Sequence, residues 1–166
     1  MDKKWWLIGL LVVSGLGLLF WSNSDTQVIK RRANAILDTF HFEEDEKSPL
    51  VSEKLQDLMD ETIVLKTPEG KMHAHWKMRD GSRMKRGNAV AAHRTIQQYA
   101  ESGTVTNREI EILSIENQIA TVSVKFHLDV KVKKGSFGKK VDDDFDCIFT
   151  FEQKKGDWLL TGVEIK

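Results

Sequence analysis

The chain has 166 residues, with 25 lysines and arginines balanced by 25 aspartates and glutamates, so its formal net charge is zero at pH 7. This length is enough for one domain with a substantial apolar core and too short for two ordinary domains. A neutral chain has no long-range field to attract nucleic acid, and a single cysteine, Cys147, excludes an internal disulfide. We therefore expect no nucleic-acid partner.

The most apolar part of the chain is Trp5–Trp21, WWLIGLLVVSGLGLLFW, which contains no charged residue. As a helix this segment would be about 25 Å long, close to the lower limit for crossing a bilayer. Tryptophans at both of its ends suit the headgroup zones of a membrane. We expect residues 1–23 to be an uncleaved membrane anchor and residues 24–166 to be one domain.

A cleaved signal peptide is the alternative interpretation of this leader. Lys3 and Lys4 would form its basic N-terminal region, and Ser22-Asn23-Ser24 would be its small-residue cleavage site. The apolar run is longer than the core of such peptides, and Ser24-Asp25-Thr26-Gln27 has the pattern of a capping box that begins a helix. The two lysines favour a cytoplasmic N-terminus. They predict a single-pass protein whose domain lies outside the cytoplasm, which in a bacterium is the periplasm.

Three amphipathic helices are expected in the domain. The first, about residues 25–42, has apolar residues with a helical period: Ile29, Ala33, Ile36, Leu37 and Phe40. Ser48-Pro49 is a cap followed by a first-turn proline, and it begins a second helix whose inward residues are Val51, Leu55, Leu58 and Met59. The third helix covers about residues 87–102 and ends at Gly103.

The remaining segments predict antiparallel strands. A hairpin of Thr62–Lys66 with Lys71–Arg79 comes before the third helix, and four longer strands follow it. The strict alternation of Ala120–Val132 indicates a strand with one buried face. In the last strand, Trp158–Ile165, the apolar alternation shifts at Gly162, which predicts a bulge.

A four-residue loop at Gly135–Gly138 would determine how two of these strands pair. It places Val132 opposite Val141 and Phe126 opposite Cys147, with apolar residues facing each other throughout. On the polar face, the same pairing sets His127 against Asp146 and Lys131 against Asp142.

This order of elements resembles the nuclear-transport-factor-2-like superfamily, whose domains have a cone-shaped, cystatin-like α+β fold. The resemblance depends on the helix face Ile29–Phe40, the alternating strand Ala120–Val132 and the ending Gly156–Ile165, and it covers about Ser24–Lys166. It implies three helices packed on a curved antiparallel sheet. The superfamily includes isomerase-like and cyclase-like enzymes, scaffold domains and membrane-anchored assembly modules, so the fold does not supply the function.

Enzymes of that superfamily place polar residues inside an apolar cone, and this chain offers few. Asp143, His93 and Tyr99 are the candidates. Asp143 lies near a loop where water would reach it, and the other two side chains suit a helix–sheet interface. We therefore expect no catalytic residue. The residues expected to line the cone are Phe126, Leu128, Phe145, Cys147, Phe149 and Trp158.

His73, His75, Lys77 and Arg79 share one face of a predicted strand. Two histidines without a further nearby ligand do not make a zinc site, so we interpret these residues as a surface for a partner. No nucleotide-binding, zinc-protease or serine-hydrolase motif occurs, and we expect no metal and no cofactor.

The sequence therefore favours a non-enzymatic binding or assembly module tethered to a membrane through Trp5–Trp21. Its expected partner is another protein or a second copy of itself. The alternatives are an isomerase- or cyclase-type enzyme and a carrier of an apolar small ligand in the cone.

Overall fold

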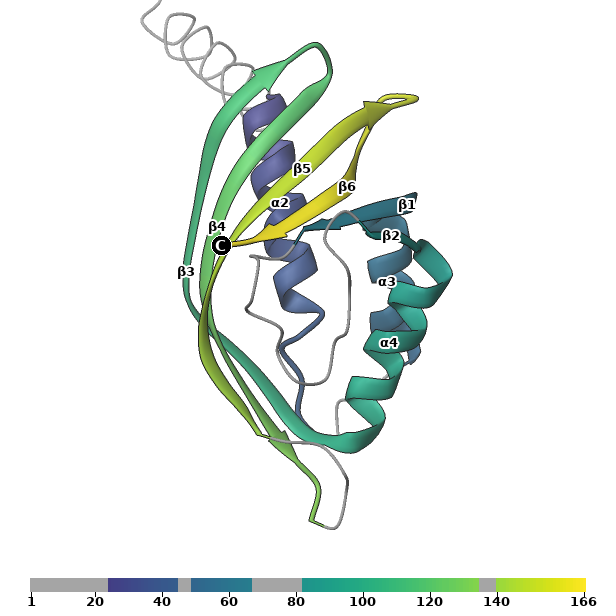
Figure 1. Ribbon diagram of the computed structural model, residues 1–166, viewed down its shortest axis with the longest axis vertical. Helices are drawn as coiled ribbons and strands as arrows, with labels where there is room; N and C mark the ends of the chain where they lie inside the picture. Colours follow the sequence, from purple (N-terminus) through teal and green to yellow (C-terminus); the bar gives the residue numbers. More distant parts are fainter. Residues whose placement is uncertain (1–23, 45–48, 67–81, 135–139) are drawn as a thin grey trace, which may run out of the picture.

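The computed structural model describes residues 24–44, 49–66, 82–134 and 140–166 (Figure 1). Its helices are α2 (Asp25–Asp38), α3 (Pro49–Leu58) and α4 (Arg86–Tyr99). Its strands are β1 (Met59–Lys66), β2 (Ser82–Lys85), β3 (Ala100–Glu116), β4 (Ile119–Val132), β5 (Val141–Lys154) and β6 (Asp157–Ile165). The predicted anchor and the predicted strand Lys71–Arg79 lie outside these residues.

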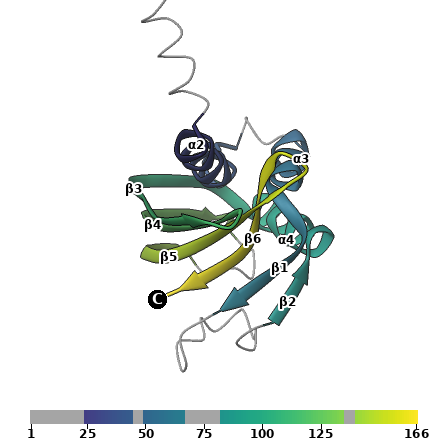
Figure 2. The ribbon, with the colours of Figure 1, turned by 90° about the horizontal axis from the view of Figure 1, so that it is seen from above.

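The strands form one curved sheet in the order β2-β1-β6-β5-β4-β3. In Figures 1 and 2, α2 lies across the concave side of this sheet, and α3 and α4 pack together beside β1 and β2. The α+β class with helices on a curved sheet is confirmed, but the sheet is mixed rather than antiparallel because β1 runs parallel to β6. Parallel neighbours require a long connection, and here most of the domain separates the two strands.

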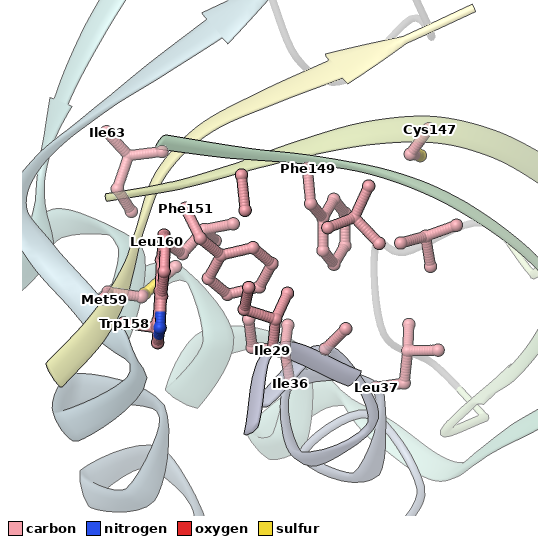
Figure 3. Close-up of a cluster of buried hydrophobic side chains, with 14 of the residues drawn as sticks. Ile29, Ile36, Leu37, Met59, Ile63, Cys147, Phe149, Phe151, Trp158 and Leu160 are labelled. Carbon is pink, nitrogen blue, oxygen red and sulfur yellow. The ribbon is translucent and has the colours of Figure 1, made fainter. Parts of the chain in front are cut away.

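The apolar face of α2 forms the centre of the core. Ile29, Ala33, Ile36 and Leu37 are buried, as the helical spacing predicted. In Figure 3, Ile29, Ile36 and Leu37 lie on the side of α2 that faces Phe149 and Phe151 of β5. Ser24 occupies the predicted N-cap position, but it makes no side-chain cap hydrogen bond.

The first helix ends four residues earlier than predicted. At its end the Thr39 hydroxyl donates to the carbonyl oxygen of Ile36 (2.7 Å), which satisfies one of the helix's last carbonyl groups. Phe42, expected within the helix, instead exchanges two backbone hydrogen bonds with Gly103, each 2.9 Å long. The pairing with β3 stops the helix, and the sequence of the helix alone contains no sign of it.

The third helix is also shorter than predicted. It ends at Tyr99, and β3 begins at the next residue, Ala100, which pairs with Val132. Ser102, predicted to be helical, lies in β3 opposite Lys131. The inner stripe of α4 consists of Val90, His93 and Gln97.

The described antiparallel partner of β1 is β2: Thr62–Leu65 pairs with Ser82–Lys85. The predicted partner, Lys71–Arg79, lies outside the described residues. The strand β2 is only four residues long, and its alternating pattern is too short to stand out in the sequence.

The pairing of β4 with β5 is shifted by two residues from the predicted register. Val130, not Val132, is opposite Val141, and Phe126 is opposite Phe145 rather than Cys147. A shift of two keeps every side chain on its predicted face, so alternation cannot distinguish the two registers. The predicted bulge in β6 is confirmed, because pairing passes from Thr150 with Gly162 to Phe151 with Leu160.

Gly103 is required where the end of α2 meets β3. A Cβ atom there would lie 2.5 Å from the carbonyl oxygen of Phe40 and 2.7 Å from the ring of Phe42. We expect Gly103→Ala to lower the free energy of unfolding by about 2 kcal/mol or more, measured by urea denaturation. The matched control is Gly87→Ala in α4, where a Cβ meets nothing within 4 Å. It should leave stability unchanged or raise it by up to about 1 kcal/mol. Equal losses in the two variants would contradict the close contact.

Candidate functional site

A serine and a histidine lie side by side in the buried interface between α3, α4 and the end of α2. The Ser52 Oγ atom is 3.0 Å from His93 Nδ1, and His93 Nε2 is 2.8 Å from the Thr39 carbonyl oxygen. A carbonyl can only accept, so Nε2 carries the hydrogen and Nδ1 accepts from the Ser52 hydroxyl. Phe40 contacts the imidazole edge-on, with ring centroids 5.0 Å apart.

This pair has the residue types of a nucleophile and its base, but its surroundings exclude that role. Ser52 is 0% exposed and His93 is 2% exposed, so no substrate atom can reach either side chain. Both ring nitrogens are already engaged in hydrogen bonds. Burial lowers the pKa of His93, and the hydrogen bond to Thr39 opposes this only in part. The histidine is therefore a neutral link that joins the three helices.

Gln97 completes this buried cluster, and sequence reasoning missed both Gln97 and Ser52. The Oε1 atom of Gln97 is 3.4 Å from Ser52 Oγ, and its Nε2 atom is buried without a partner among the described residues. Helical spacing could have indicated the cluster. Ser52 is three residues before the buried Leu55, and Gln97 is four residues after His93, so each falls on a buried stripe.

The three candidate catalytic residues do not meet around one cavity. Asp143 is exposed on β5, and its Oδ1 atom accepts a hydrogen bond from the Asp144 backbone (3.0 Å). Tyr99, at the end of α4, is 51% exposed. His93 is enclosed by its own hydrogen bonds. No two of these groups are placed to act together on a ligand.

The residues expected to line a pocket divide into two groups. Cys147, Phe149 and Trp158 are buried in the packed core, while Phe126, Leu128 and Phe145 are half-buried at its edge. The rings of Phe126 and Phe145 stack with centroids 5.2 Å apart.

These two rings border a shallow hollow of about 260 Å³ that is open to solvent. Its other lining residues are Asn107, Glu109, Lys125, Asp144 and Asp146. Three carboxylates and an ammonium group lie around the two rings, so the hollow is an open surface of mixed polar and apolar character and does not enclose a ligand.

A second open groove lies on the helical side of the molecule, between α3 and α4. Gln56 contributes from α3, and α4 contributes Arg86, Val90 and Arg94. Its volume is about 520 Å³. Arg86 also donates to the Met59 carbonyl oxygen (3.4 Å), which fixes the groove's position beside β1.

The outer face of the sheet is polar, and none of the described helices covers it (Figure 2). Here His127 lies between two aspartates. Its Nδ1 atom is 2.9 Å from Asp144 Oδ1, and its Nε2 atom is 3.3 Å from Asp142 Oδ1. The prediction of Asp146 as its partner was wrong, because the register is shifted by two.

Lys140 binds Asp142 at 2.7 Å, in place of the predicted Lys131. The hydrogen bond from Lys140 lowers the pKa of Asp142.

Within the described residues, no group of three or more histidine, cysteine, aspartate and glutamate side chains could hold a metal ion. His73, His75, Lys77 and Arg79, the predicted partner surface, lie outside the described residues.

In the part of the chain that the structure describes, no helix is long and apolar enough to cross a membrane.

Several solved structures share this arrangement of helices and sheet. A nuclear-transport-factor-2-like protein from Cytophaga hutchinsonii is 13% identical, covers 86% of this chain and 98% of its own, and superposes with a TM-score of 0.56. A domain of unknown function with a cystatin-like fold from Nostoc punctiforme is 14% identical, covers 87% of this chain and 77% of its own, and gives a TM-score of 0.58. The chain therefore has the nuclear-transport-factor-2-like, or cystatin-like, fold.

These similarities establish the fold alone. A proposed aromatic ring hydroxylase from Novosphingobium aromaticivorans, 10% identical, covers 86% of this chain and 87% of its own with a TM-score of 0.64. Proteins described as enzymes and proteins of unknown function thus share the same architecture. No protein-family model matches the sequence, and no curated protein is significantly similar to it.

The buried histidine predicts how stability depends on pH. The pKa of His93 is lowered in the folded protein, while an unfolded histidine takes up its proton at about pH 6.5. As pH falls below about 6.5 the unfolded chain gains a proton that the folded protein does not. The free energy of unfolding should therefore decrease as the pH falls from about 6.5 toward the lowered pKa, as measured by urea denaturation in steps between about pH 7.5 and 5.5.

Two variants isolate this effect. His93→Gln removes the titrating ring and should flatten the pH dependence between about pH 7.5 and 5.5. Gln98 is exposed on the same helix and has no titrating group, so Gln98→Ala should keep the slope of the wild type. A His93→Gln variant with an unchanged slope would show that another group causes it.

Proposed function

We propose that this protein is a non-enzymatic binding or assembly module that the apolar segment Trp5–Trp21 holds at a membrane. One observation carries the non-enzymatic part: the centre of the cone is filled by the protein's own side chains. Trp158, Phe149 and Phe151 are at most 5% exposed, and they pack against Ile29 and Leu37 of α2. A filled cone leaves no room at its centre for a substrate.

The buried polar groups support the same conclusion. An acid–base enzyme needs a titratable group that can reach its substrate and exchange a proton with it. His93 is inaccessible and has both nitrogens engaged, while Asp143 and Tyr99 are exposed and apart from it. Ordinary packing and solvation account for all three residues, so an isomerase or cyclase activity has little support. The hollow beside Phe126 is open to solvent and bordered by charged groups, which gives little support to a carrier of apolar ligands.

The interaction surface that fits best is the outer face of the sheet. Side chains on this face alternate with the buried residues of β4 and β5, so they point away from the helices. Its acidic residues are Glu109, Glu111, Asp142, Asp144, Asp146 and Glu164. They outnumber the basic Lys66, Lys125, Lys131, Lys140 and Lys154 on the same face, to which Asp129 and Glu152 add two further carboxylates. We infer a protein partner whose contact surface carries lysine and arginine.

Site-specific photo-crosslinking of the full-length protein in its membrane tests this surface. A crosslinker in place of Glu111 or Glu164 should capture one defined partner, and Glu109→Lys should abolish the capture because it places a positive charge opposite the partner's own. The control position is Glu53, an exposed acidic residue on α3. Equal capture from Glu53, or capture that the charge reversal leaves unchanged, would contradict an acidic docking face.

A further inference from the structure

The helix that follows the leader begins at one end of the sheet. The side chain of Asp25, the first residue of α2, accepts a hydrogen bond from Trp158 Nε1 (2.9 Å). Trp158 pairs with Gln153 on β5, and the Gln153 backbone donates to the Gln118 carbonyl oxygen (2.8 Å). Trp158 and Gln118 are thus two strand spacings apart, about 10 Å.

Two tight turns form this end of the sheet. Asn117-Gln118 connects β3 to β4 and Lys155-Gly156 connects β5 to β6, each with both residues at positive φ. Two-residue turns of this kind hold the flanking residues in a defined position. Figure 1 shows the first turn of α2 at the same end of the molecule as these hairpins. We call this region the turn end.

Two large apolar side chains are exposed near the turn end. Leu113 is 51% exposed and Ile119 is 46% exposed. Pairing passes directly from Ile112 with Val122 to Ser114 with Thr121, so Leu113 is the extra residue of a bulge on an edge strand. Ile119 is the first residue after the β3–β4 turn, on the face opposite the buried Ala120. Neither side chain contributes to the core.

The proposed anchor connects to this same end through a short segment. From Trp21 to Asp25 the chain can span at most about 14 Å, even when fully extended. If Trp21 lies at the headgroup level of the bilayer, α2 begins close to the membrane surface. The turn end, about 10 Å across, is then the part of the domain that faces the lipid.

Charge at the turn end does not oppose such a contact. Arg32 binds Asp157 at 2.8 Å, and Lys154 binds Asp60 at 2.8 Å and Glu152 at 3.3 Å. These five groups leave one net negative charge, and the exposed Glu116, opposite Ile119, is offset by the exposed Lys155. Contact with a bilayer would therefore depend on the apolar side chains.

We propose that Leu113 and Ile119 insert into the headgroup region of the membrane that holds the anchor, so that the turn end rests on the bilayer. This proposal rests on the proposed function, because without the anchor nothing brings this end to a membrane. The opposite end, where Tyr99 precedes β3, then points away from the lipid. The contact would give the domain a defined orientation, in which its strands point away from the bilayer surface.

Fluorescent labelling of the full-length protein in phosphatidylcholine vesicles tests this orientation. Leu113→Cys and Ile119→Cys each carry an environment-sensitive NBD label, and spin-labelled phosphatidylcholine serves as quencher. The native Cys147 is 3% exposed and burial raises its pKa to about 12, so it should not react, and the wild type is the labelling blank. Tyr99→Cys is the matched control, because Tyr99 is as exposed as Leu113 but lies at the other end. Ser22→Cys reports on the anchor.

The expected result is a shift of emission to shorter wavelength and quenching by lipid at positions 22, 113 and 119, with neither at position 99. Quenching at position 22 alone would overturn the lipid contact and leave the anchor intact. Quenching at all four positions would overturn the defined orientation. No quenching at position 22 would contradict the anchor itself, and the lipid contact would fall with it.

Discussion

The packing of α2 across the concave side of the sheet is the interaction on which the rest of the structure depends. Ile29 and Leu37 are almost fully buried there, against aromatic side chains of β5 and β6. A curved sheet has an apolar concave surface that must be covered, and α2 covers it with a single stripe. The same contact fills the centre of the cone. One interaction therefore both stabilises the fold and occupies the centre of the cone.

The buried polar cluster completes this arrangement at the other end of α2. His93 receives a hydrogen bond from α3 and donates one to the residue that ends α2, so one neutral side chain joins three helices. A buried serine–histidine pair suggests catalysis when residue types alone are considered. Its burial and its saturated hydrogen bonds indicate instead that it holds the helices in place.

Features that depend on one segment could be predicted, and features that depend on two distant segments could not. The stripe from Ile29 to Leu37 and the alternation of Ala120–Val132 each lie in one element, so periodicity identified them. The register of β4 with β5 was displaced by two because either pairing buries the same residues. The early end of α2 depends on Gly103, which lies 61 residues after its partner Phe42, and the parallel pairing of β1 with β6 depends on most of the chain.

The candidate site shows the same difference between features that depend on one segment and features that depend on two distant segments. Asp143, His93 and Tyr99 were recognised by residue type, but only tertiary structure separates an exposed carboxylate from an enclosed imidazole. Ser52 and Gln97 were missed because a polar residue on a buried stripe has no obvious partner until another helix supplies one.

The unfolding free energy of Leu37→Ala tests most directly whether the cone is filled by α2. Leu37 is 1% exposed in the core, and removing it should lower that free energy by about 2–5 kcal/mol. Leu113→Ala, at an exposed position, should change it by no more than about 0.5 kcal/mol. Equal, small effects from the two variants would show that the side chains of α2 do not fill the interior, and would contradict the account.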